Sequence, residues 1–408
     1  QVDFLPAEEP AVGERNVTQV FIDPYTGNYL GQRHELDGLV GWANQLHRLF
    51  GNDGPALSLP SLGHLIAPSA YPDASIKVGI GNLAIEMAAV WVLVLAATGI
   101  YLWWPRAIER GKPRLAVRWA KGGRIRWRDL HATTGILVSV VLIGYIVSGL
   151  TWSRYWGENW RAVAATLTPP TEIEAPSTPA TVGDYDRLGR RIAWADKEDP
   201  VYASAAAGAV SKPLTFNDID QIAKSENMIP GYSIVPPSDS TEDGETTYGS
   251  YTVVNHWPQK LSEQRTLYLD QFSGQTIANA TADQDGALDR ITSWGVNTHM
   301  GTQYGVFTRI LATVFCLGLL TSIATATMMW WKRRPTGTAG LPGRSSADLR
   351  SNTPRGAVIA IGVIATALAV LYPSFGVTLV IVLIAEAIVE SRRKNRRPET
   401  VVPQSADD

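Results

Sequence analysis

Cysteine is almost missing from this 408-residue sequence, which contains only Cys316. A single cysteine excludes a disulfide within the chain, a cysteine-ligated iron–sulfur cluster and a Cys-x-x-Cys-His site for covalent haem attachment. The sequence also lacks a Gly-rich nucleotide loop that would place a nicotinamide or flavin nucleotide on the chain. A haem in this protein would therefore have to be held noncovalently.

An excess of either charge is missing as well, because 36 Lys and Arg residues stand against 38 Asp and Glu residues. The net charge of −2 says little about partners, since the basic residues are concentrated in particular loops. We expect no nucleic acid among the partners.

Three apolar stretches are long enough to cross a membrane. They cover residues 79–104, 130–152 and 305–331. About 20 apolar residues in a helix cross the roughly 30 Å hydrocarbon core of a bilayer. A fourth stretch, residues 357–389, is too long for one ordinary span and is interrupted at Pro373. The sequence therefore predicts a polytopic α-helical membrane protein surrounded by lipid.

The basic loops predict how these spans are oriented. Residues 105–128 contain nine Lys or Arg and one acid, and residues 332–355 contain six and one. Such loops stay in the cytoplasm, whereas residues 153–302, with 11 basic and 20 acidic residues, fit an exterior domain. The basic tail should also be inside. We therefore expect the fourth stretch to be a helical hairpin turning at Pro373; a single tilted helix is the alternative.

One order of features occurs twice along the chain. An apolar strand ends in Asp-x-x-Thr/Ser-Gly, first at Asp23 and again at Asp270. A histidine follows, His47 and then His299, and after each histidine comes a span that ends in Trp-Trp. Each turn is a hairpin signal in which Gly supplies a positive φ. The shared order indicates an internal repeat.

The repeat also predicts a further helix. In the second copy the polar segment follows a span that opens with Asp129 to Gly135 and contains His131. The first copy should likewise follow a span with a histidine near its cytoplasmic end. We therefore expect an N-terminal helix, together with the opening part of the first exterior module, to precede Gln1. Such a helix would carry residues 1–78 to the outside.

With its repeated turns, histidines and span ends in this order, the chain resembles the PepSY-associated transmembrane proteins. This family includes siderophore-iron reductases of the bacterial inner membrane. The resemblance covers nearly the whole chain and includes Leu-His-Arg at residues 46–48, Arg-Asp-Leu-His at 128–131 and Trp-Trp-Pro-Arg at 103–106. It implies two exterior, periplasmic α/β PepSY modules and a helical core that binds haem b through histidine ligands.

The chain then divides into ten segments. They are the C-terminal part of the first PepSY module (residues 1–45), an exterior histidine-bearing helix and connection (46–78), a span (79–104), a cytoplasmic basic loop (105–128), a span (129–152), the second PepSY module with its linker (153–298), a span (299–331), a cytoplasmic loop (332–355), the helical hairpin (356–389) and a cytoplasmic tail (390–408). Within the second module, residues 214–223 are typical of a capped amphipathic helix and residues 168–181 of a linker.

Three of the six histidines are candidate haem ligands: His47, His131 and His299. Each lies beside a span, where an imidazole is costly unless it is paired or bound. Gly51 and Gly135 follow His47 and His131 by one turn and leave room for a flat macrocycle. The topology places His47 and His299 near the exterior face and His131 near the cytoplasmic face. The alternative for each is an interfacial side chain bonded to a backbone carbonyl.

Two histidines at one depth on different helices can take both axial positions of a haem iron. We expect an outer haem b between His47 and His299. An inner haem b would use His131 and a further ligand from the N-terminal helix. His64 is the next candidate, as a ligand or substrate contact.

Arginines near the spans are candidate partners of haem propionates, because guanidinium pairs bidentately with carboxylate. They are Arg48, Arg128, Arg154 and Arg309. Each could instead be an ordinary interfacial cation. The tryptophans that flank the spans fit an aromatic belt.

Haems at both faces would carry electrons across the bilayer from a cytoplasmic or quinol donor. The resemblance implies an oxidoreductase whose exterior oxidant is a ferric chelate such as a ferric siderophore. One electron loosens the metal, since hard oxygen donors hold Fe³⁺ better than Fe²⁺, and no nucleophile or general base is required. Two alternatives remain: a PepSY binding module without redox activity, acting in peptidase inhibition or signalling, and a quinol-linked haem protein that feeds another exterior partner.

Overall fold

The computed structural model describes most of the chain in ten stretches. They are residues 2–4, 18–34, 37–49, 55–108, 115–120, 123–183, 199–205, 212–255, 258–333 and 354–394, apart from positions 24, 116 and 243. Gly51, His256, most of the expected loop at 332–355 and the tail from residue 395 lie outside these stretches.

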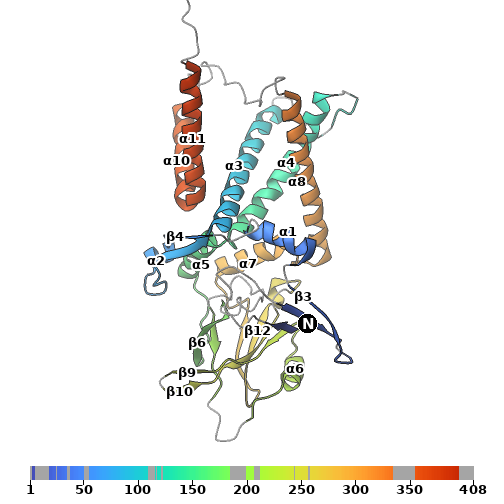
Figure 1. Ribbon diagram of the computed structural model, residues 1–408, viewed down its shortest axis with the longest axis vertical. Coiled ribbons are helices and arrows are strands. Elements are labelled where there is room, and N and C mark those ends of the chain that lie inside the picture. Colours follow the sequence, from blue (N-terminus) through green and yellow to red (C-terminus); the bar gives the residue numbers. More distant parts are fainter. Residues whose placement is uncertain are drawn as a thin grey trace, which may run out of the picture.

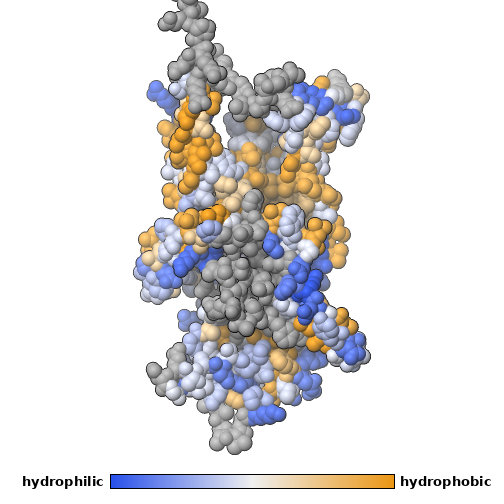
Figure 2. All heavy atoms as spheres, viewed as in Figure 1, coloured by the Kyte–Doolittle hydropathy of each residue, from blue (hydrophilic) through white to orange (hydrophobic). Residues whose placement is uncertain are grey.

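Three long apolar helices form the core of the molecule (Figure 1): α3 (Ile80–Ile108), α4 (Arg124–Leu150) and α8 (Val306–Arg333). Each contains a segment long and apolar enough to cross a membrane. Helix α4 packs against both others. Apolar residues form a band along the helices (Figure 2), as expected of surfaces that face lipid. Three helices capable of spanning a membrane are thus confirmed.

The fourth apolar stretch forms a hairpin of α10 (Arg355–Leu371) and α11 (Pro373–Lys394), joined at Tyr372. The hairpin lies beside α3 (Figure 1). Its turn is anchored because Tyr372 and Phe375 are buried against Val90 of α3. The single tilted helix is therefore not the structure of this segment.

A polar domain lies at one end of the spans, which we call the domain side (Figure 1). Its main sheet is antiparallel and has the strand order β13-β12-β11-β8. The strands are β8 (Ser233–Val235), β11 (Ser250–Val254), β12 (Arg265–Asp270) and β13 (Thr276–Thr281). A small hairpin of β9 (Ser240–Glu242) and β10 (Glu245–Thr247), and a 3₁₀ turn at Leu261–Glu263, complete this region.

Both faces of this sheet are covered. Helix α6 (Phe216–Ser225) begins with a capping box between Thr215 and Asp218 and buries Ile219 against Leu267 and Leu269. On the other face, Tyr268 packs with residues of β6 (Ser177–Thr181) and β7 (Pro200–Tyr202). Strand side chains alternate between faces, so the apolar run at 267–269 reflects burial on both sides. The expected linker at 168–181 therefore ends in a strand.

The two copies of the repeat form the same turn. Strands β2 (Thr18–Ile22) and β3 (Tyr29–His34) pair across it, with β1 (Val2–Phe4) beside β2, as β12 and β13 pair in the second copy. In each turn the glycine N–H donates to the Asp carbonyl at 2.9 Å, Gly27 to Asp23 and Gly274 to Asp270. The glycine φ angles are +72° and +71°, which disfavour any other residue. This geometry supports the internal repeat.

A layer of short elements separates the spans from the polar domain (Figure 1). It consists of α1 (Gly38–Leu49), β4 (Ala56–Pro60), α2 (Leu62–Ile66), β5 (Ser75–Gly79), α5 (Tyr155–Leu167) and α7 (Ala287–His299). The sequence placed His299 at the start of a span over 299–331, but it ends α7 instead. Gly301, Tyr304 and Gly305 have φ values of 71°, 61° and 60°, and this left-handed backbone separates α7 from α8.

Glu86 of α3 connects this layer to the spans through hydrogen bonds to α5. Its Oε1 accepts hydrogen bonds from the backbone N–H groups of Tyr155 at 2.9 Å and Trp156 at 3.3 Å. These two groups open α5, whose N-cap residue Arg154 makes no side-chain cap bond. The first N–H groups of a helix lack partners within it and carry partial positive charge. The fully buried Glu86 carboxyl therefore caps α5 from another helix.

Candidate functional site

His47 and His299 lie close together although they come from opposite halves of the chain. His47 lies near the end of α1 and His299 is the last residue of α7. Their ring centroids are 6.0 Å apart and the ring planes differ by 36°. The structure thus brings together the two histidines that the sequence paired, on the domain side of the spans.

The His299 ring is oriented by the backbone of α4. Its Nδ1 lies 2.8 Å from the carbonyl oxygen of Tyr145 and 3.4 Å from Oγ of Ser148. Because a carbonyl can only accept, Nδ1 carries the proton and Nε2 is the basic nitrogen. Metal-binding histidines use their second ring nitrogen in this way, which fixes the tautomer and the ring orientation.

The surroundings of His299 favour its neutral form. Burial lowers the pKa of His299 below its usual range, the hydrogen bond to the Tyr145 carbonyl opposes this, and the nearby His47 lowers it further. A neutral imidazole is the form that coordinates a metal.

A glycine in α4 makes room for this ring. A Cβ atom at Gly149 would lie 2.8 Å from Cε1 and 3.2 Å from Nδ1 of His299. The Tyr145 ring lies 5.1 Å from His299 and stacks on Phe315 of α8 at 4.7 Å. Four helices therefore meet at the histidine pair: α1, α4, α7 and α8. Tyr145, Gly149 and Phe315 belong to apolar spans, and no local sequence pattern predicts their place at this site.

His131 of α4 makes the same kind of contact with the backbone of α8. Its Nδ1 lies 3.1 Å from the carbonyl oxygen of Ser322 and 3.2 Å from Oγ1 of Thr325, both in α8. Fourteen residues separate His131 from Tyr145, which is about 21 Å along α4 at about 1.5 Å per residue. A Cβ at Gly135 would meet only Oγ of Ser322, at 3.9 Å. His131 and His299 therefore mark opposite ends of the α4–α8 pair, and Gly135 lies beside Ser322, the residue whose carbonyl contacts His131.

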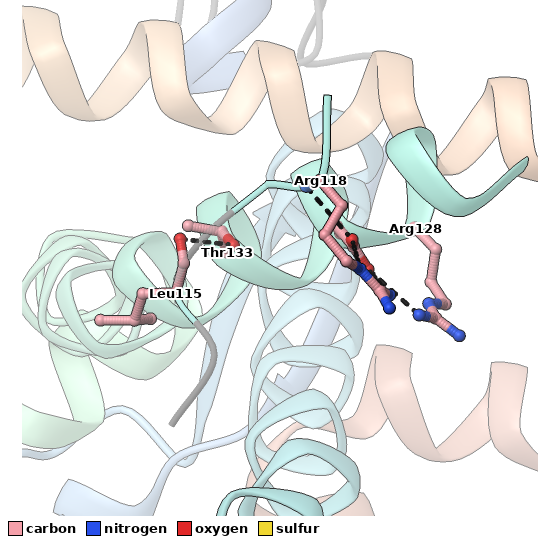
Figure 3. Close-up of polar contacts among 5 residues, drawn as sticks. Leu115, Arg118, Arg128 and Thr133 are labelled. Carbon is pink, nitrogen blue, oxygen red and sulfur yellow. Dashed lines mark hydrogen bonds and ion pairs between the residues drawn. The ribbon is translucent and has the colours of Figure 1, made fainter. Parts of the chain in front are cut away.

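The start of α4 is covered by part of the basic loop (Figure 3). Arg118 binds Asp129 bidentately, with Nε 2.6 Å from Oδ2 and Nη2 2.8 Å from Oδ1. Arg128, a candidate propionate partner, contacts the same carboxylate at 3.1 Å. Thr133 donates to the Leu115 carbonyl at 3.1 Å. Asp129 thus holds the loop against α4. Arg118 is one of nine basic residues in this loop, and no sequence pattern predicted its contact with Asp129.

The other candidate arginines have different surroundings. Arg48 follows His47 in α1, and its side chain lies outside the described residues. Arg154 forms an ion pair with Glu158 at 2.6 Å. Arg309 is exposed near the start of α8.

The remaining histidines do not join the pair. Nδ1 of His64 lies 3.0 Å from the carbonyl oxygen of Tyr71, so this ring stabilises the turn after α2. His34 is exposed in β3, and His256 lies outside the described residues.

A protein-only metal centre is not present in the part of the chain that the structure describes, since no group of three or more His, Cys, Asp or Glu side chains gathers there. Two opposed imidazoles hold a metal if a macrocycle supplies its other ligands, as haem does. With ring nitrogens about 2 Å from a shared metal, their centroids would stand about 6 Å apart. The His47–His299 pair, at 6.0 Å, fits such a group.

Apolar helices, a polar sheet domain and a layer that carries the histidine pair define a multi-pass membrane protein. The chain belongs to the family of the PepSY-associated TM region, whose model matches residues 2–333. The family resemblance seen in the sequence is confirmed, and the match ends before the α10–α11 hairpin. No curated protein matches the chain.

Proposed function

We propose that this protein is an oxidoreductase of the bacterial inner membrane that binds haem b and reduces a ferric chelate, such as a ferric siderophore, on the exterior side. The observation that carries the proposal is the pair His47 and His299, whose ring centroids are 6.0 Å apart. Membership of the PepSY-associated family supports it, because that resemblance implies histidine-bound haem b.

The residues of the site would hold the haem in different ways. His47 of α1 and His299 of α7 would hold the haem iron. The Tyr145 carbonyl holds His299 in the tautomer that leaves Nε2 for the iron, and Gly149 lets the ring approach α4. A haem bound by two histidines supplies one-electron transfer and has no open position for dioxygen.

His131 is the proposed ligand of a second haem b at the other end of the α4–α8 pair. The Ser322 carbonyl orients its ring as the Tyr145 carbonyl orients His299. A histidine facing His131 is not found among the described residues, so the second ligand of this haem must lie elsewhere. The electron donor would act at this end, either as a cytoplasmic protein or as a quinol.

The proposed orientation places the polar domain, as PepSY modules, outside the cell and the basic loops inside. It can be tested with cysteines introduced at Ala120 and at Ser240 in a Cys316→Ser background. An impermeant thiol reagent applied to intact cells should label the second and not the first; the reverse pattern would overturn the orientation.

The absorption spectrum of the purified full-length chain tests the proposal itself. Dithionite should produce a sharp α-band, acidic acetone should extract the haem, and an added ferric chelate should reoxidise the reduced protein. A chain without haem would favour a PepSY binding module in peptidase inhibition or signalling. Haem that is reduced but not reoxidised by ferric chelates would favour a quinol-linked protein with another exterior partner.

A further inference from the structure

Helix α1 turns its apolar face away from the protein. Leu39, Trp42 and Leu46 follow one another at intervals of three and four residues and so share one face. Their exposed fractions are 79%, 59% and 39%. On the opposite face Gly41 is buried and Asn44 is half-buried. A surface helix in water normally directs its apolar face toward the core, and α1 does the reverse.

The position of α1 relates this face to the spans. Figure 1 shows α1 lying across the domain-side ends of the long helices, and α1 packs against α3. The apolar surface of α8 begins at the same side, where Val306, Phe307 and Ile310 are 67%, 68% and 60% exposed. The outward face of α1 is therefore level with the start of a surface that faces lipid.

Other elements of the same layer also expose apolar side chains. In α2, Leu65 and Ile66 are 70% and 48% exposed. Trp294 of α7 is 45% exposed, and its Nε1 donates to the hydroxyl of Tyr304, which is 53% exposed. Tryptophan and tyrosine with polar atoms bonded and rings exposed are typical of the membrane–water interface. Exposed apolar side chains are therefore shared by α1, α2 and α7 of this layer.

We propose that α1 lies within the membrane interface, with Leu39, Trp42 and Leu46 in contact with lipid of the leaflet next to the polar domain. An amphipathic helix in this position buries its apolar face about 5–10 Å into the boundary between headgroups and acyl chains. Lipid contact then fixes the depth of α1. If the proposed function holds, it also fixes the depth of His47 relative to His299, and one ligand helix is positioned by the bilayer rather than by the protein core.

Fluorescent labels on α1 can test this placement. In a Cys316→Ser background, Leu39→Cys and Leu46→Cys would each be labelled with an environment-sensitive nitrobenzoxadiazole dye and the full chain placed in phosphatidylcholine nanodiscs. Lipids spin-labelled near the headgroup should quench both labels, whereas aqueous iodide should quench them weakly. The control is Tyr25→Cys, because Tyr25 is 95% exposed in the β2–β3 turn; iodide should quench it and the spin-labelled lipids should not.

Two results would overturn the proposal. Labels at positions 39 and 46 that respond to iodide as strongly as the label at position 25 would place the face in water. Labels shielded from both quenchers would show that protein covers the face, whether a second copy or another segment of the chain. Haem is not part of this readout, so its outcome is separate from that of the proposed function.

Discussion

The imidazole of His299 lies against the backbone of Gly149 so closely that a methyl group at position 149 would stand 2.8 Å from its Cε1. Real Cβ atoms do not approach a neighbour at that distance, so any side chain at this position must displace the ring. The close approach also brings Nδ1 of His299 to the Tyr145 carbonyl. The absence of a side chain at Gly149 thus allows the backbone of α4 to orient the ring of a candidate ligand.

The first prediction follows from this contact. Gly149→Ala should move His299 and reduce the haem content or shift the low-spin spectrum of the purified protein. Gly144→Ala is the matched control, because a Cβ at Gly144 meets nothing within 4 Å. Alanine is favoured over glycine in a helix by about 1 kcal/mol, so the control should keep its spectrum and unfold at an equal or higher temperature. Identical spectra for the two variants would show that Gly149 does not position the ring.

A second prediction concerns the cap that Glu86 provides to α5. Glu86→Ala removes the acceptor of the Tyr155 and Trp156 N–H groups and should cost about 1–3 kcal/mol. Glu86→Gln keeps an oxygen acceptor at the same place and should recover most of that loss. Thermal unfolding in detergent would rank the variants. Equal destabilisation by alanine and glutamine would contradict capping by a neutral oxygen acceptor and show that the negative charge is required.

A third prediction concerns the pH dependence of stability. Burial, with Asp199 and Asp289 nearby, raises the pKa of Asp285 to about 7. Burial, opposed by Arg161, raises the pKa of Asp289 to about 6. The unfolded carboxyls titrate near pH 4, so between about pH 4 and pH 7 the folded protein binds more protons. Stability is therefore highest below this window and falls as the pH rises through it.

The test is to replace one carboxyl. Asp285→Asn should flatten the decline between pH 5 and pH 8 and raise stability at pH 8 by about 1–3 kcal/mol. Asp283→Asn is the control, because the Asp283 side chain is 88% exposed. Unfolding midpoints measured across this range should separate the two. A profile for Asp285→Asn that parallels the unmodified protein would mean that this carboxyl titrates normally.

Sequence patterns predicted the long apolar helices and the two repeated turns of this fold. The apolar stretches specified α3, α4, α8 and the hairpin, since their length and composition are local properties. The turns at Asp23 and Asp270 were predicted because a positive φ requires glycine at a fixed offset. His47 and His299 were paired because the topology predicted from the basic loops places both near the exterior face, and their equivalent places in the two copies agree with this.

Contacts between distant residues had no such signature. Nothing near Gly149 indicates that a histidine from another helix will pack on it, and Glu86 is indistinguishable in sequence from a misplaced charge in a span. The third span was expected to begin at residue 299, seven residues before α8 begins at Val306, because the left-handed backbone at Gly301, Tyr304 and Gly305 is not evident from the sequence. Such features depend on tertiary packing, which overrides local preference.

The ligand pairing of His47 and His299 is tested most directly by the visible and electron paramagnetic resonance spectra of three alanine variants. His47→Ala and His299→Ala should each convert the domain-side haem to a five-coordinate high-spin form or lose it, and added imidazole should restore a low-spin signal where the haem is retained. His131→Ala should keep that haem and lose only the other. If His47→Ala and His299→Ala both retain full haem content and unchanged low-spin spectra, these two histidines do not share an iron.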